Sequence, residues 1–229
     1  MAAGGDAGPH RVGGHAYAAR VGGLVRVIGL TGGIATGKST AADALEAVGA
    51  PVVRSDLLAR AAVAPGTRGL AAVAAAFGPE VLRSDGSLDR QALGRVVWSD
   101  APARRRLEGI VHPLVRDAML AWLAERRREG TAAAVCDIPL LFEVGLHRPG
   151  SFVDRVWVVS VRPETQRRRL MARDGLNAQD AAARIALQWP LVAKVALADR
   201  VFDNEASPDD LRRQVVAAWA QTLGAASAR

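Results

Sequence analysis

Residues Leu24 to Glu46 read LVRVIGLTGGIATGKSTAADALE, and this stretch decides the fold. Its first part, Leu24 to Leu30, is an apolar run rich in β-branched side chains, which predicts a buried parallel strand. The pattern G-x-x-x-x-G-K-[ST] follows and is satisfied by Gly32, Gly37, Lys38 and Ser39. Because apolar positions then recur at helical spacing from Ser39 to Val48, the motif has the strand, loop and helix of a phosphate-binding loop.

The composition of this loop follows from the chemistry of a polyphosphate. Successive N–H groups in a glycine-rich turn converge on an anion, and the start of the following helix adds roughly half a positive charge. We expect Lys38 to contact the β- and γ-phosphates of a nucleotide and the hydroxyl of Ser39 to ligate Mg²⁺. The expected nucleotide-binding residues of the loop are Gly32, Gly33, Ile34, Ala35, Thr36, Gly37, Lys38, Ser39 and Thr40.

Charge and composition favour a small anionic ligand. The 229 residues carry a net charge of +7, and the bases are almost all arginine, with Lys38 and Lys194 as the only lysines. The planar guanidinium of arginine suits phosphate. A nucleic-acid surface is the alternative, but aromatic residues make up only 4% of the chain and the arginines form no single run interleaved with them. We therefore predict no nucleic-acid partner.

The single cysteine, Cys136, excludes a disulfide framework and a multi-cysteine metal site. This composition fits a reducing compartment, and in its apolar surroundings Cys136 is expected to be a small core residue. No apolar stretch approaches the ~20 residues of a membrane span. We predict a cytoplasmic protein with no membrane partner.

The first residues, 1–23, are rich in glycine and alanine and lack the apolar segment of a secretory signal. We expect a disordered extension. Two alternatives are an organelle transit peptide and a misassigned start codon, with the true start near Val21 or Leu24.

Further apolar runs predict the rest of a parallel sheet that is covered on both faces. Strands are predicted at Ala50–Arg54, at Thr131–Asp137, at Phe152–Val161 and just before Asn204. The segment 57–130 holds no convincing strand, and its pattern predicts a helical insertion that supplies a wall for a second substrate. Its expected helices are Leu57–Val63, Gly69–Phe77, Leu88–Trp98 and the long, amphipathic Pro102–Arg128.

Polar side chains follow several of these strands, and ligands gather at the carboxyl ends of parallel strands. Asp56 either caps the next helix or takes part in chemistry. Asp137 is either an acid that holds Mg²⁺ through water or a loop cap. Asn204 is expected to face the nucleotide, whereas His112 inside the insertion is first read as a packing or capping residue.

A strongly basic helix is predicted to begin at Pro163. Its arginines repel one another unless an anion lies among them, and a transferring phosphoryl group is a strong candidate; a solvated basic face is the alternative. These arginines are Arg167, Arg168, Arg169 and Arg173. A helix over Ala178–Trp189 follows within a predicted lid, 174–192, and a closing helix over Leu211–Leu223 precedes a tail, 224–229.

The complete pattern resembles the dephospho-CoA kinase family, from about Val25 to Leu223. The phosphate loop by itself indicates only a nucleotide-binding protein, but the motifs are specific in this order and spacing. The motifs that carry the resemblance are IGLTGGIATGKST (28–40), SDLLAR (55–60), DG-x-LDR (85–90), LE-x-IVHPL (107–114), PLLFE (139–143), ETQ-xx-R-xxx-RD (164–174), RI-xx-Q (184–188) and AD-x-V-x-DN (198–204).

The resemblance implies an α/β P-loop kinase fold over 24–223, with a five-stranded parallel sheet, a helical substrate domain and a lid. It implies transfer of the γ-phosphoryl group of ATP, with Mg²⁺, to the ribose 3′-hydroxyl of dephospho-CoA, by a monomer or weak homo-oligomer. Asp56 matches the base or orienter of that hydroxyl, and Lys38 and Arg169 match phosphate-contacting positions, while His112 gains a substrate-side interpretation. The alternatives are a kinase for another small nucleotide or hydroxyl acceptor, and a nucleotide switch or nucleic-acid-binding ATPase.

Two residues depart from the pattern of the family. Arg54 stands where the family commonly has the first acid of a D-x-D element, which puts any role of that element in binding Mg²⁺ in doubt. Ala35 stands where a glycine is often found. A methyl group is tolerated there if φ is negative and costs about 1 kcal/mol or more if φ is positive.

Overall fold

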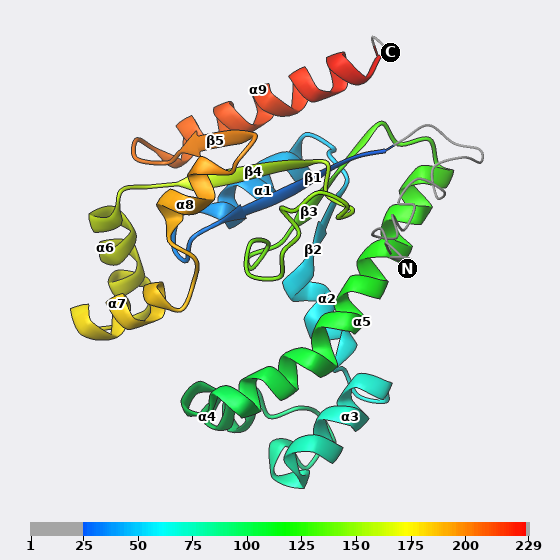
Figure 1. Ribbon diagram of the computed structural model, residues 1–229, viewed down its shortest axis with the longest axis vertical. Coiled ribbons are helices and arrows are strands. Elements are labelled where there is room, and N and C mark those ends of the chain that lie inside the picture. Colours follow the sequence, from blue (N-terminus) through cyan, green and yellow to red (C-terminus); the bar gives the residue numbers. More distant parts are fainter. Residues whose placement is uncertain (1–24, 228–229) are drawn as a thin grey trace, which may run out of the picture.

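The computed structural model describes residues 25–227, and a five-stranded parallel sheet lies at its centre (Figure 1). The strands are β1 (Arg26–Gly32), β2 (Val52–Arg54), β3 (Ala133–Asp137), β4 (Arg155–Ser160) and β5 (Arg200–Asp203). Their order across the sheet is β2-β3-β1-β4-β5, and every neighbouring pair is parallel. The predicted α/β fold with its five parallel strands is confirmed. The predicted extension, 1–23, lies outside the described residues.

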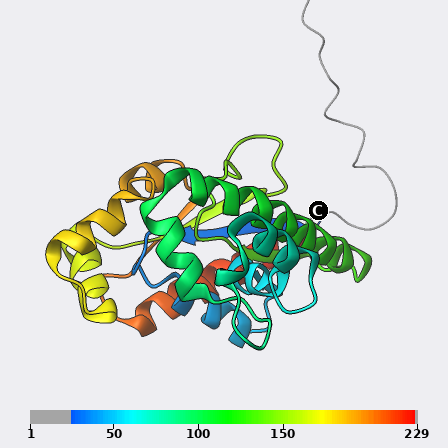
Figure 2. The same ribbon diagram turned by 90° about the horizontal axis from the view of Figure 1, so that it is seen from below.

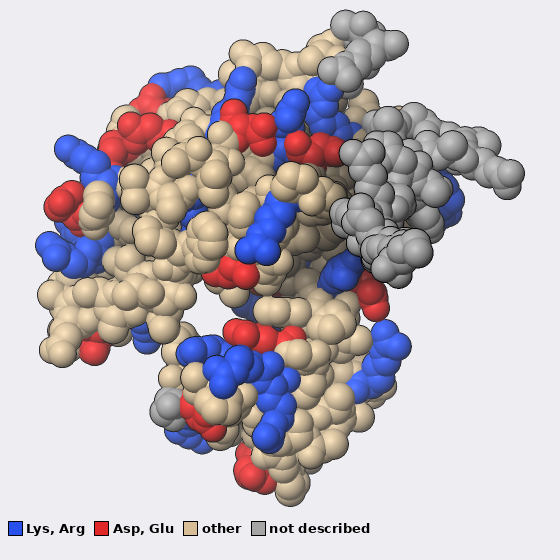
Figure 3. Space-filling view, viewed as in Figure 1, with Lys and Arg blue, Asp and Glu red and all other residues tan. Residues whose placement is uncertain are grey.

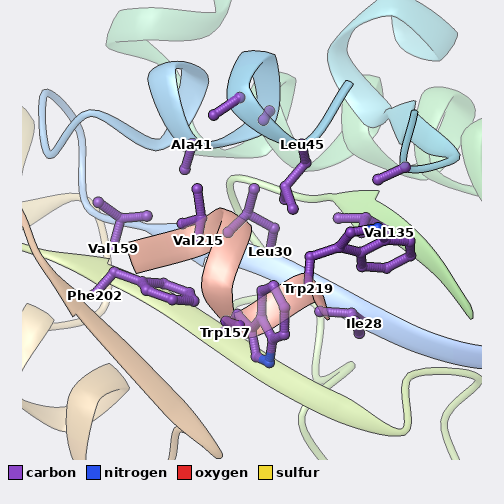
Figure 4. Packing of buried hydrophobic residues seen from close by; sticks show 14 of the residues in the cluster. Ile28, Leu30, Ala41, Leu45, Val135, Trp157, Val159, Phe202, Val215 and Trp219 are labelled. Atoms are coloured by element: carbon purple, nitrogen blue, oxygen red, sulfur yellow. The ribbon is translucent and has the colours of Figure 1, made fainter. Parts of the chain in front are cut away.

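Helices cover both faces of the sheet, which explains why its strands are apolar without alternation. On one face, α1 (Lys38–Ala47) and α9 (Pro208–Ser227) pack on the sheet. Figure 4 shows Leu45 of α1 and Val215 of α9 beside Leu30 of the central strand. On the other face, α5 (Ala101–Arg128) and α8 (Leu191–Ala196) contribute to the second core cluster.

The segment between β2 and β3 is helical and has a core of its own. Its elements are α2 (Ser55–Ala62), α3 (Arg68–Phe77), a 3₁₀ helix (Pro79–Val81), α4 (Arg90–Ser99) and α5. Figure 1 shows α3 and α4 below the sheet, with α5 running from them back to it. The insertion therefore stands beside the carboxyl end of β2, where the chain leaves the sheet.

After β4 come α6 (Pro163–Asp174) and α7 (Ala178–Ala186), which together correspond to the basic helix and the helix of the predicted lid. Figures 1 and 2 both show these two helices at one end of the molecule. The helix predicted to continue to Trp189 ends at Ala186, because the residue before Pro190 disfavours helical angles. The sequence pattern did not separate α8, whose six residues are too short for a clear period.

The closing helix extends beyond its predicted C-terminal end at Leu223. It begins at Pro208, where the Ser207 hydroxyl accepts a hydrogen bond from the N–H of Asp210 at 3.1 Å, and continues to Ser227. Most of the predicted tail, 224–229, is therefore helical, because its alanines favour a helix and Gly224 alone does not stop one. None of the helices among the described residues is long and apolar enough to cross a membrane.

Candidate active site

The phosphate-loop sequence joins β1 to α1. From β1 the chain continues toward β2 and β3 on one side of the sheet and later toward β4 and β5 on the other. The neighbours of β1 are β3 on one side and β4 on the other, so a crevice is expected at its carboxyl end. Gly37 takes φ 95° and is the N-cap of α1. A Cβ at Gly32 would lie 2.6 Å from Thr36 Oγ1 and 2.8 Å from the carbonyl oxygen of Val159, so this position has room only for glycine.

Protein donors bind the carbonyl groups of the loop. Thr36 Oγ1 donates to the carbonyl of Gly33 at 2.9 Å, and Asn204 Nδ2 donates to that of Thr36 at 2.8 Å. The first N–H groups of α1 have no acceptor one turn earlier in the helix, and this end carries the positive pole of the helix dipole. The loop therefore has the polarity that an anion such as a phosphate requires.

Ala35 has φ 60°, the one positive value among the non-glycine residues that the structure describes. Because φ is positive, the methyl group of Ala35 costs free energy at this position, where the family often has glycine. A left-handed alanine is disfavoured by about 1–2 kcal/mol. Such a conformation persists only where the surrounding contacts hold it.

Lys38 and Asp137 form an ion pair between Nζ and Oδ1. Asp137 ends β3 and is only 3% exposed, and its register partner on β1 is Leu30. Burial raises the pKa of Asp137, while the charge of Lys38 opposes that rise. The carboxylate of Asp137 therefore contacts the lysine of the phosphate loop, and its part in holding Mg²⁺ stays a prediction.

Asp56 lies in the first turn of α2, at the end of the strand next to β3. It is exposed, and its Oδ1 accepts a hydrogen bond from the N–H of Leu57 at 2.9 Å. The N-cap of α2 is Arg54, so the interpretation of Asp56 as the capping residue is wrong. Its negative charge contributes to the raised pKa of Asp137, so the two carboxylates interact across the ends of β2 and β3.

Arg54 contacts α1 through its side chain. Its guanidinium lies 2.5 Å from Asp43 Oδ1 and 2.7 Å from Glu46 Oε2, and these hydrogen bonds raise its pKa. The residue that replaces the expected acid is therefore engaged by two carboxylates of α1. Its contacts explain how a cation is tolerated there.

Arg169 reaches the loop through its neighbour in space, Asn204. The guanidinium donates to the carbonyl of Asn204 at 2.9 Å, and Asn204 is 5% exposed beneath Thr36. No donor from the described residues binds the buried Oδ1 of Asn204. The structure thus brings Arg169, Asn204 and the phosphate loop together.

The other arginines of α6 do not join this group. Arg167 and Arg168 are exposed, in agreement with the solvated-face interpretation. Arg173 pairs with Asp174 at 2.7 Å, which also accepts from Arg184 at 2.9 Å. His112 is exposed in the middle of α5, and none of its described contacts links it to the loop.

Two glutamines at the loop were not predicted as site residues. Gln166 Nε2 donates to the carbonyl of Ile34 at 2.9 Å, and Gln188 Oε1 accepts from the N–H of Ile34 at 2.8 Å. They lie 132 and 154 residues from Ile34 along the chain. Both belong to motifs that the sequence analysis quoted, but no local pattern connects such distant residues.

Oxygen donors suited to Mg²⁺ gather at the same edge. Ser39 is exposed at the second position of α1, and the carboxylate of Asp137 contacts Lys38 at the first. No group of three or more acidic, histidine or cysteine ligands occurs among the described residues. This set fits a Mg²⁺ that takes one or two protein oxygens and completes its shell with phosphates and water.

The site opens toward the helical insertion. Figure 3 shows a hollow between the part of the molecule that carries the sheet and the helices below it, with basic and acidic side chains at its edge. Arg184 of α7 lies 5.6 Å from the ring centroid of Trp98 on α4, so the α6–α7 segment contacts the insertion. The site is therefore bordered by the sheet, the insertion and the α6–α7 segment.

Comparison with known proteins agrees with this architecture. The family model described as dephospho-CoA kinase matches residues 26–210. The dephospho-CoA kinase of Anaeromyxobacter dehalogenans is 55% identical over 187 residues, which cover 82% of this chain and 87% of the relative. That of Geobacter sulfurreducens is 48% identical over 197 residues, covering 86% and 98%.

Two solved structures share the fold. The structure of TT1252 from Thermus thermophilus superposes with a TM-score of 0.72 at 36% sequence identity and covers 86% of this chain and 97% of its own. The dephospho-CoA kinase from Campylobacter jejuni superposes with a TM-score of 0.60 at 26% identity, with the same coverage of both chains.

Proposed function

The chain belongs to the dephospho-CoA kinase family, and from this premise we propose a role for each residue at the edge of its sheet. It is a kinase that transfers the γ-phosphoryl group of ATP to the ribose 3′-hydroxyl of dephospho-CoA, the final step of coenzyme A synthesis. In such a transfer the protein mainly positions the reactants and neutralises developing charge. The observation that carries the proposal is that Lys38, Asp137 and Asp56 share one edge beside the phosphate loop.

The phosphate loop and Lys38 bind the triphosphate of ATP. The ion pair with Asp137 holds the Lys38 ammonium at the mouth of the loop, and the phosphates replace or share that partner when ATP binds. Arg169 supplies a second positive charge from α6, beside Asn204, where the transition state gains negative charge. Asn204 supports the loop from below through the carbonyl of Thr36.

Asp56 orients the acceptor hydroxyl and accepts its proton. Its exposed carboxylate stands at the end of the strand that leads into the insertion, so an acceptor bound between insertion and sheet meets it. The Leu57 N–H holds one of its oxygens at 2.9 Å and leaves the other for the hydroxyl. Closure of the α6–α7 segment keeps water from replacing that acceptor.

Ser39 and Asp137 would hold Mg²⁺, which would supply positive charge against the phosphates of ATP. We also place the enzyme in the cytoplasm, as a monomer or weak homo-oligomer with ATP and dephospho-CoA as its partners and without nucleic acid or membrane.

A coupled assay of ADP release tests this function. We expect rapid ADP release only when ATP, Mg²⁺ and dephospho-CoA are all present, and coenzyme A as the second product. A purified, folded protein that is inert toward this pair would overturn the proposal. Because the loop and the sheet are shared by many kinases, a panel of other nucleosides and small alcohols serves as the comparison.

A further inference from the structure

The peptide groups around Ile34 are held from both sides by side chains of the segment that follows β4. The N–H of Ile34 donates to Gln188 Oε1 at 2.8 Å, and its carbonyl accepts from Gln166 Nε2 at 2.9 Å. An N–H group can only donate and a carbonyl can only accept, so the orientation of both side-chain amides is determined by chemistry. The proposed function assigns neither glutamine a contact with the phosphates or with the acceptor hydroxyl.

The bond from Gln166 holds the peptide plane before Ala35, and the bond to Gln188 holds the plane before Ile34. The carbonyl of Ile34 belongs to the peptide plane before Ala35, and the N–H of Thr36, which donates to the carbonyl of Gly33 at 3.3 Å, belongs to the plane after it. Ala35 at φ 60° therefore lies between two held peptide planes. Contacts of this kind are what a strained, left-handed alanine requires.

The two glutamines are themselves held. Gln166 is 5% exposed, and a Cβ at Gly33 would lie 2.5 Å from its Nε2, so this side chain rests directly on the loop. Next to Gln188, the N–H of Trp189 donates to Glu143 Oε1 at 2.9 Å. The same oxygen accepts from the fully buried Lys194 at 2.8 Å. Glu143 thereby anchors the backbone next to Gln188 to the turn after β3.

We propose that Gln166 and Gln188, here called the glutamine clamp, are positioning residues that keep the phosphate loop in its binding shape. They act through the Ile34 peptide groups and hold Ala35 in the left-handed conformation. They also couple the α6–α7 segment to the loop, since they lie near its two ends. The inference rests on the proposed role of the loop in binding ATP.

Replacing each glutamine by glutamate tests the proposal, because the two substitutions are expected to differ in their effect on ATP binding. Gln188→Glu keeps the acceptor for the Ile34 N–H, whereas Gln166→Glu removes a donor and sets a carboxylate against a carbonyl. Both add one negative charge near the phosphates, so the difference between them isolates the hydrogen bond. We expect Gln166→Glu to weaken ATP binding about tenfold more than Gln188→Glu, measured as Kd by calorimetry. Gln179→Glu, on the exposed surface of α7, is the matched charge control.

A second measurement tests whether the glutamines affect ATP binding by holding Ala35 in its left-handed conformation. Gln188→Met removes the acceptor without adding charge and is expected to raise the Kd for ATP roughly tenfold. In an Ala35→Gly background that loss should shrink several-fold, because glycine adopts φ 60° without the clamp. If Gln166→Glu does not fold, Gln166→Met is compared in the same two backgrounds, with circular dichroism to establish folding.

Equal losses in Gln166→Glu and Gln188→Glu, or the same loss from Gln188→Met in the wild-type and Ala35→Gly backgrounds, would overturn the clamp. Turnover of ATP and dephospho-CoA by the wild-type enzyme is measured alongside. An inert wild type that binds ATP with the predicted pattern refutes the proposed function and leaves the clamp supported. An active wild type without the pattern refutes the clamp alone.

Discussion

At the scale of single residues, the charges at the carboxyl edge of the sheet are arranged before any ligand binds. Lys38 is paired with Asp137, and Asp56 acts on Asp137 from the neighbouring strand end. In the proposed function, the phosphates of ATP replace or share this partner of Lys38. The edge is therefore set up for an exchange of partners, which suits a site that binds and discharges a nucleotide on each turnover.

Removing the side chain of Lys38 or of Asp56 is expected to lower turnover strongly. Lys38→Ala deletes the charge proposed to contact the phosphates, and Asp56→Ala deletes the carboxylate proposed to orient the hydroxyl. Each should lower kcat by ~10² or more while the protein stays folded. Steady-state kinetics with both substrates, and circular dichroism for the fold, make the measurement. Asp56 is exposed, so its removal is not expected to disturb the fold. Near-normal turnover in Asp56→Ala would remove this residue from the mechanism.

Cys136 provides a test of burial through its titration. Burial raises the pKa of its thiol from 9.0 to about 12. Its contribution to stability is therefore present below pH 9 and is lost as the pH rises toward 12, because the unfolded state releases its proton first. At pH 9 we expect iodoacetamide to label the protein only under unfolding conditions, since the thiolate is the reacting form. Labelling of the native protein at the rate of a free thiol would contradict this burial.

At the scale of elements, α5 holds the insertion to the sheet. Its first half contributes Leu107 and Ile110 to the core of the insertion, and its second half contributes Met119 and Leu123 to the core under the sheet. Pro113 lies inside the helix between these halves and removes one backbone hydrogen bond. One helix thus belongs to two cores, and their relative position depends on it.

We expect Leu123→Ala to destabilise the protein by about 2–5 kcal/mol, because it leaves a cavity in a fully buried position. Urea unfolding of the variant and the wild type gives this difference. Leu197→Ala, at a position that is 52% exposed, is the control and should change stability by no more than about 0.5 kcal/mol. Equal effects from the two substitutions would mean that α5 does not depend on this contact.

At the scale of the whole molecule, the insertion and the α6–α7 segment meet beyond the sheet. Arg184 lies over the ring of Trp98, and the same guanidinium pairs with Asp174. The hollow in Figure 3 is bordered by these parts of the chain. Because the acceptor is proposed to bind between the insertion and the sheet, this contact bears on how firmly it is enclosed.

Trp98→Ala is expected to raise KM for dephospho-CoA about two- to fivefold, since an exposed cation–π contact contributes about 0.5–1 kcal/mol. Arg184→Ala removes this contact together with the ion pair to Asp174, so its effect should be at least as large, and the double variant should change KM no more than Arg184→Ala alone. Steady-state kinetics at saturating ATP makes the comparison. Additive effects, or a KM unchanged in both single variants, would show that the contact plays no part in enclosing the acceptor.

What the sequence determined by itself was the local chemistry and the class of fold. The phosphate-loop motif, the apolar runs of the strands and the order of the family motifs are contiguous patterns, and the parallel sheet and the kinase family followed from them. Strand and helix ends were less certain, and α8 and the 3₁₀ helix were too short to show a period. The lid and the roles of Asp56 and Arg169 stay predictions.

The tertiary structure decided which distant residues meet. Lys38 finds Asp137 99 positions away, and Ile34 is held by glutamines 132 and 154 positions away. Periodicity describes how a segment buries one face, but not which strand lies beside which, and these pairings depend on strand order. The sign of φ at Ala35 was open for the same reason, because the contacts that hold it come from the far end of the chain.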